Sequence, residues 1–86
     1  MRSYEFTLWV TPPLAIDDPD SWANAVYAAG GDDTLVGCRS GQNFIHFDRE
    51  AISFDEVVKS AFRTVRDAGG HVLRLDVPED QLSWAQ

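Results

Sequence analysis

Residues 53–70 read SFDEVVKSAFRTVRDAGG and carry the strongest secondary-structure signal in the chain. Ser53 and Glu56 have the spacing of a capping box, in which two side chains satisfy backbone N–H groups at a helix start. Ile52, directly before the cap, is placed to pack on the helix as a hydrophobic staple. Apolar residues then recur with helical period up to Gly69-Gly70, a pair typical of a helix end. The segment therefore predicts an amphipathic helix.

The segments on both sides of this helix have the composition of strands. Residues 34–38 and 44–47 are short β-prone runs, and residues 39–42 between them, Arg-Ser-Gly-Gln, predict a hairpin turn. Gly41 can take the positive φ that such a turn needs. After the helix, residues 72–77 form a last predicted strand that Pro78 ends.

The N-terminal half repeats the order of strand, helix, strand. In residues 4–10 an apolar set alternates with Glu5, Thr7 and Trp9, which is the period of a strand with one buried face. The apolar set is Tyr4, Phe6, Leu8 and Val10. Asp18-Pro19 then predicts a helix start, and Gly30-Gly31 predicts its end.

The predicted order of elements is β-α-β-β-α-β. With right-handed crossovers this order gives a ferredoxin-like α+β sandwich, a four-stranded antiparallel sheet with two helices on one face. A chain of 86 residues makes one domain. We assign residues 1–78 to that domain and residues 79–86 to a short polar C-terminal tail that carries Leu82 and Trp84.

The composition restricts the classes of partner. Fourteen acidic and seven basic residues give a net charge of −7, which disfavours direct binding of nucleic acid or of an anionic membrane. The single cysteine excludes an intrachain disulfide and suits a reducing compartment. The chain shows no signal peptide and no apolar run long enough to span a membrane. We therefore expect a cytoplasmic protein.

The sheet face away from the helices is the candidate interaction surface. Thr7 and Trp9 are expected on that face, and an exposed tryptophan there indicates a partner interface, cover by the tail, or a platform for stacking bases. In the third strand either alternating set, residues 44, 46 and 48 or residues 43, 45 and 47, places an aromatic outside. The expected partner-binding residues are Thr7, Trp9, Phe47, Asp48, Arg49 and Trp84.

No residue set predicts catalysis, a metal site or a cofactor site. His46 and His71 have no second ligand at short spacing, and Cys38 has only Arg39 beside it, although a Cys38–His46 pair across the hairpin is conceivable. Asp17, Asp18 and Asp20 are interpreted as charge at a helix start. The cluster at residues 48–50, Asp-Arg-Glu, either docks a partner or forms a local ion pair.

Several short motifs from about residue 22 onward resemble a family of short bacterial proteins of unassigned function. Residues 47–51, Phe-Asp-Arg-Glu-Ala, are the most specific of them. The others are Ala29-Gly30, Asp32-Asp33, Ser60-Ala61, Val65, Ala68-Gly69, Val72, Arg74-Leu75, Pro78, Asp80 and Leu82. Longer members of that family carry a C-terminal helix-turn-helix. The resemblance implies a sensory, dimerising or antitoxin-like module, here without a recognition helix of its own.

Taken together, the sequence favours a small non-catalytic protein-interaction or dimerisation domain, with a regulatory or antitoxin-like role. The expected partner is a second copy or another protein. An alternative is a sensor domain that binds a small metabolite at a dimer interface, which rests on analogy of fold. An enzyme is not expected, because the sequence shows no convergent set of titratable groups.

Overall fold

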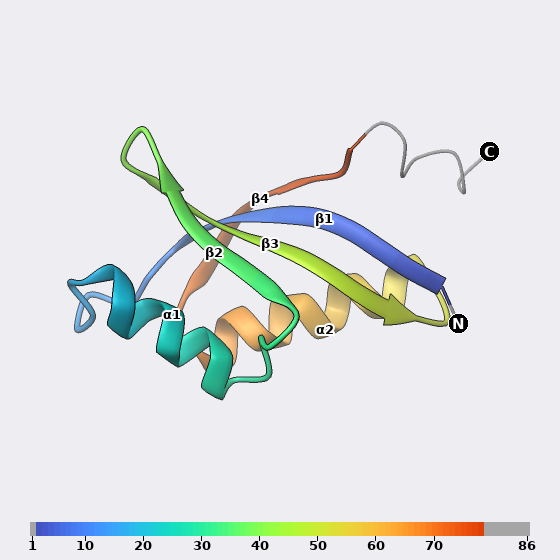
Figure 1. The fold of residues 1–86 in the computed structure, drawn as a ribbon, viewed down its shortest axis with the longest axis horizontal. Coiled ribbons are helices and arrows are strands. Elements are labelled where there is room, and N and C mark those ends of the chain that lie inside the picture. Colours follow the sequence, from blue (N-terminus) through green and yellow to red (C-terminus); the bar gives the residue numbers. More distant parts are fainter. Residues whose placement is uncertain (1, 79–86) are drawn as a thin grey trace.

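The computed structural model describes residues 2–78. These residues form four strands and two helices in the predicted order, as Figure 1 shows. The elements are β1 (Arg2–Thr11), α1 (Pro19–Ala28), β2 (Thr34–Arg39), β3 (Gln42–Ala51), α2 (Phe54–Asp67) and β4 (His71–Asp76). The predicted tail, with Leu82 and Trp84, lies outside the described residues.

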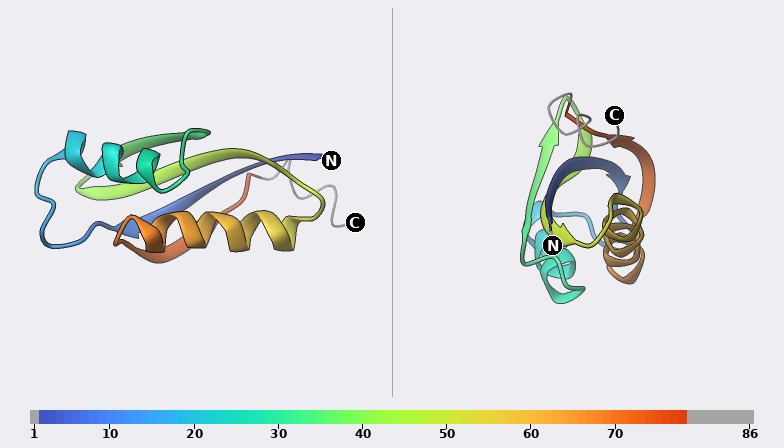
Figure 2. Two further views of the ribbon diagram at one scale, coloured as in Figure 1. Left: turned by 90° about the horizontal axis from the view of Figure 1, so that it is seen from below. Right: turned by 90° about the vertical axis from the view of Figure 1, so that its right-hand side faces the viewer.

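The four strands form one antiparallel sheet in the order β2-β3-β1-β4. Both helices lie on one side of it, and the β2–β3 turn rises on the other side (Figure 2, right). This arrangement confirms the predicted ferredoxin-like α+β fold. It also leaves one face of the sheet without a covering layer among residues 2–78.

The core lies between the sheet and the two helices. The predicted apolar set of β1 is buried there, with Phe6 and Leu8 fully enclosed. Phe6 stacks on Phe47 of β3 with ring centroids 5.3 Å apart, and Phe54 at the start of α2 meets Phe6 edge-on. Two-residue alternation in the central strands therefore fixes which side chains face the helices.

Both helices begin at the predicted caps. The Asp18 side chain accepts a hydrogen bond from the backbone N–H of Ser21 at 2.9 Å, and Ser53 accepts one from Glu56 at 3.2 Å. The prediction of a hydrophobic staple is wrong, since Ile52 remains 75% exposed and does not pack on the helix. Neither helix of the described chain has the length and apolar character needed to cross a membrane.

The β2–β3 hairpin turns at Ser40 and Gly41. Their φ angles are 52° and 78°, so both central residues of this two-residue loop take the left-handed conformation. A loop of that kind matches the twist of the flanking strands. The turn was correctly predicted from Gly41, although Ser40 also adopts positive φ.

Strand β3 is longer than its sequence suggests. The β-prone run covers residues 44–47, whereas β3 pairs with β1 from residue 43 to residue 51. The polar residues 48–50 continue the strand because their side chains alternate between the solvent side and the helix side of the sheet. Asp48 and Glu50 are exposed, while Arg49 is held by partners on the helix side. The charge cluster expected after the strand is therefore part of it.

Candidate functional site

The candidate site is the sheet surface on the side away from the helices, which we call the outer face. The strand registers place two residues of each strand near its centre. These residues are Leu35 and Arg39 from β2, Phe44 and His46 from β3, Thr7 and Trp9 from β1, and Arg74 and Asp76 from β4.

Trp9 is held in place by contacts on three sides. Its ring lies 5.5 Å from the Phe44 ring, and the Arg74 guanidinium lies 5.1 Å from its centroid. Its Nε1–H donates to Asp76 Oδ2 at 2.7 Å, and Arg74 forms an ion pair with the same carboxylate at 3.2 Å. The indole is only partly buried, so a rigid aromatic surface faces outward.

Gly37 lets the Phe44 ring lie flat against β2. The two residues are cross-strand partners, and a Cβ added at Gly37 would collide with the far edge of the Phe44 ring. An aromatic ring packed over a strand glycine compensates for the missing side chain. The absence of a side chain at residue 37 thus positions the second aromatic of the outer face.

His46 links β3 to polar groups of β1. The Thr7 hydroxyl lies 3.0 Å from His46 Nδ1, and His46 Nε2 lies 3.4 Å from Glu5 Oε1. The order hydroxyl, imidazole, carboxylate is that of a nucleophile, a base and an orienting group. A nucleophile also needs N–H donors aimed at the developing oxyanion. Here the neighbouring backbone groups belong to mid-strand residues in the sheet ladder, so the three side chains act as a cross-strand polar network.

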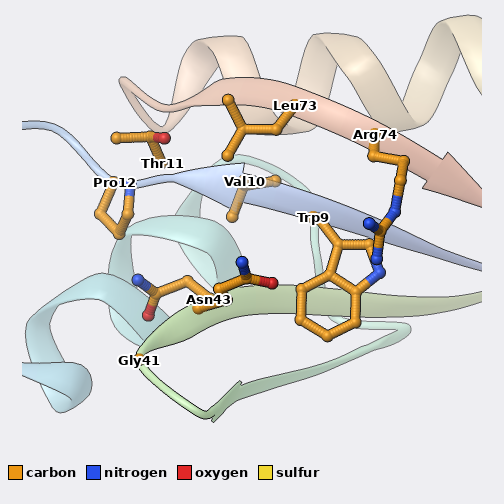
Figure 3. A pocket seen from close by; sticks show the side chains of 9 residues that line it. Trp9, Val10, Thr11, Pro12, Gly41, Asn43, Leu73 and Arg74 are labelled. Atoms are coloured by element: carbon orange, nitrogen blue, oxygen red, sulfur yellow. The ribbon is translucent and has the colours of Figure 1, made fainter.

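Two hollows open on either side of Trp9. One, of about 300 Å³, lies over Thr7, Leu35, Phe44 and His46. The other, of about 420 Å³, lies between the β2–β3 turn and β4, with Trp9 and Arg74 at one end and Pro12 at the other (Figure 3). A register shift between β1 and β4 after Trp9 turns Leu73 outward beside it. The hollow over His46 is open, unlike a pocket that encloses a substrate, whereas the hollow that ends at Pro12 is more enclosed.

Charge is unevenly distributed along the outer face. Glu5, Asp48 and Glu50 lie toward the start of β1 and the end of β3. Arg39 and Arg74 lie toward the opposite end, beside Gln42 and Trp9 respectively. The outer face therefore has an acidic end and a basic end, and the Trp9–Phe44 pair lies on the basic side of its centre, in the same row as Arg74.

The structure separates the predicted site residues into groups. Thr7, Trp9 and Asp48 belong to the outer face, although Asp48 lies at its acidic end. Phe47 is fully buried in the core, so it is corrected from a partner-binding to a core residue. Phe44 is the aromatic residue of β3 that lies on the outer face. Trp84 lies outside the described residues.

Arg49 lies on the helix side of the sheet and has a structural role there. Its guanidinium makes two hydrogen bonds to the Asp33 carboxylate, at 2.6 and 2.8 Å. It also donates to Ser60, Thr64 and the Gly30 carbonyl. The side chain is only 14% exposed and lies over the Phe47 ring. Arg49 thus joins β3 to α2 and to the loop before β2, which corrects its assignment to a partner surface.

The sequence did not single out Phe44 and His46. It offered both alternating sets of β3 without a choice, although one signal was available. The set with residues 44, 46 and 48 contains a charged carboxylate, whereas the other set contains Ile45 and Phe47. Burial of an unpaired carboxylate is costly, so the set with Asp48 belongs outside.

The remaining sequence candidates do not converge. Cys38 pairs across the hairpin with Asn43, whereas His46 pairs with Leu35, so the conceivable Cys38–His46 pair does not form. Asp18 is a helix cap, and the Ser21 backbone N–H lowers the pKa of its carboxyl below the ordinary value of 3.8. Within residues 2–78 no group of three or more His, Cys, Asp or Glu side chains is arranged to hold a metal ion.

Comparison with protein-family models, with curated proteins and with solved structures found no match to this chain. The resemblance to short bacterial proteins therefore stays a prediction.

Proposed function

We propose that this chain is a non-catalytic association domain that binds another folded protein chain through its outer face. The observation that carries the proposal is the rigid Trp9–Phe44 pair, partly exposed at the middle of an open sheet face. Tryptophan, tyrosine and arginine dominate binding energy at protein interfaces, and the tryptophan ring buries a large area at a small cost in conformational entropy.

The surroundings of the pair support association. Leu35 is 66% exposed and Leu73 is 69% exposed, so exposed apolar side chains on both edge strands flank the Trp9–Phe44 pair. Arginines and carboxylates lie around them, which is the polar rim expected of an interface. The hollow over Thr7, Leu35 and His46 is open to solvent, which suits a broad partner better than a small substrate.

Site-specific photo-crosslinking in the cells that make the protein tests this proposal. A photo-crosslinking amino acid placed at Leu35 reports on the outer face, and one placed at Tyr27 on α1 is the control, since both side chains are well exposed. We expect covalent capture of protein from position 35 and little from position 27. Equal capture from both positions, or none from position 35, would contradict the proposal.

A small-metabolite sensor is the second candidate, favoured by the hollow of about 420 Å³ beside Trp9. Its volume lies within the range of small-molecule sites, and an indole, an arginine and the amides of Gln42 and Asn43 line it (Figure 3). This candidate predicts that a planar anionic compound raises the melting temperature and that Trp9→Ala removes the effect. A screen of such compounds without any shift counts against it.

A further inference from the structure

We infer that the partner is a second copy of this chain, and that two copies pair through their outer faces in antiparallel register. The inference rests on the proposed function and names its partner.

One row of cross-strand neighbours forms the centre of the outer face, and we call it the central row. Thr7 is paired with both His46 and Asp76, and His46 is paired with Leu35. The central row therefore crosses all four strands and consists of Asp76, Thr7, His46 and Leu35.

The neighbouring rows on the two sides of the central row carry different chemistry. On one side of the central row, Trp9 and Phe44 lie two positions further along their strands, and Arg74 is paired with Trp9. On the other side of the central row, Glu5 and Asp48 lie two positions away along the same strands. The next row on the acidic side contains Glu50, and the next row on the other side contains the pair of Arg39 and Gln42.

A two-fold axis along the central row brings these unlike rows together. Rotation about such an axis lays β1 over β1 and β3 over β3 of the second copy, with strand directions reversed. Glu5 then faces the row of Trp9 and Arg74 in the second copy. Glu50 faces the row of Gln42 and Arg39 in the second copy. Both contacts occur twice, so each acidic end meets a basic end. Asp76 lies on the axis and faces Asp76 of the second copy, and each of these carboxylates is paired with Arg74 of its own chain at 3.2 Å.

Other arrangements are less favourable. An axis along the strands would place acidic end on acidic end, and like charges facing each other across an interface are strongly unfavourable. A nucleic acid would meet the carboxylates of Glu5, Asp48 and Glu50 on the same surface as the aromatic pair, in a chain of net charge −7. A second copy is the partner whose charges match those of the outer face.

The extent of the outer face suits a stable pair. Its two central strands have ten residues each and its edge strands six, which gives on the order of 500 Å² in plan. Each partner of a standard interface contributes about 800 Å² of accessible surface, which includes the relief of the side chains. Face-to-face packing of two sheets also buries Leu35, since it lies on the central row.

Charge reversal on the purified full chain tests this pairing. One variant, E5K/D48K, leaves Glu50 in place but gives the acidic end a net positive charge, and the other, R39E/R74E, makes both ends acidic. We expect each variant alone to dissociate about a hundredfold more readily than the wild type, because each end now meets a like charge. When the two variants are mixed, we expect a heterodimer of near wild-type affinity, because both contacts are again between opposite charges.

The control variant, D32K/D67K, makes the same change in net charge as E5K/D48K, at exposed positions away from the outer face, and we expect it to leave the wild-type affinity unchanged. Recovery on mixing also proves that both outer-face variants are folded. Dimers of either variant that match the wild type, or a mixture that stays monomeric, overturn the inference. A monomeric wild type that binds a labelled single-stranded oligonucleotide overturns it as well. If crosslinking from Leu35 captures only other proteins, the proposed function stands and this inference fails.

Discussion

At the scale of single residues, the positions that matter most are those where one side chain determines the place of another. Arg49 determines how β3, α2 and the loop before β2 meet, through its contacts with Asp33, Ser60 and Thr64. Gly37 determines where the Phe44 ring lies. Neither residue is explained by secondary-structure propensity, and each has a measurable consequence.

Replacement of Arg49 by methionine removes a mostly buried charge and leaves the Asp33 carboxylate without its partner. We expect Arg49→Met to lower the free energy of unfolding by about 2–4 kcal/mol. Urea denaturation at neutral pH measures the change. Arg63→Met on the exposed side of α2 is the matched control and should lie within about 0.5 kcal/mol of the wild type. Equal effects of the two substitutions would show that the contacts of Arg49 add no stability.

The contact between Gly37 and Phe44 predicts a coupling between the two residues. Gly37→Ala forces the Phe44 ring out of its place, whereas in a Phe44→Ala background the new methyl group has room. We expect a coupling free energy of about 1 kcal/mol in a double-mutant cycle, with alanine at residue 37 tolerated better once the ring is gone. Additive effects of the two substitutions would contradict the observed packing.

At the scale of elements, the helix caps are local and could be predicted from a few letters of sequence. Ser53 and Asp18 cap their helices because their side chains accept hydrogen bonds from backbone N–H groups that have no partner inside the helix. Charged and neutral caps differ in their dependence on pH, which gives a test at this scale.

The pKa of Asp18 is lowered by the hydrogen bond from the Ser21 N–H, so the folded state favours the ionised carboxylate. Its contribution to stability is therefore complete above the ordinary pKa of 3.8 and is lost as the pH falls through the lower folded-state value. We expect the stability advantage of the wild type over Asp18→Asn to shrink in that acidic range. Urea midpoints of both proteins, measured in steps from pH 7 downward, check this. An advantage that does not change with pH would contradict the account.

The limits of prediction from sequence are also seen at the scale of elements. The order of elements, the helix caps and the inward set of β1 follow from local patterns, and all three agree with the structure. The length of β3 does not follow, because residues 48–50 are polar and form a strand only through pairing with β1 and through the contacts of Arg49. The staple at Ile52 failed for a related reason, since Phe54 supplies the contact with the core instead.

The candidate site was only partly predictable for a physical reason. Trp9 and Thr7 could be placed on the outer face because β1 alternates cleanly between apolar and polar residues. The contributions of Phe44, His46, Arg39 and Arg74 depend on strand registers, which fix neighbours that are far apart in the chain. The uneven distribution of charge on the outer face exists only once these registers are known.

At the scale of the whole molecule, a helix layer covers one side of the sheet, and the other side presents an aromatic pair between ends of opposite charge. A net charge of −7 opposes unspecific self-association, and the charge-matched register of the proposed pair offsets part of that repulsion. Two copies paired in this way would form two sheets packed face to face, with the helices outside.

The solution mass of the unmodified chain tests this account most directly. Light scattering after size-exclusion chromatography, over a concentration series, should give twice the chain mass of 9.6 kDa. Trp9→Ala and Phe44→Ala should each shift the protein toward the mass of one chain, while Tyr27→Ala, on the exposed side of α1, should not. A mass of one chain at every concentration, or a dimer that both outer-face substitutions leave intact, would contradict the account.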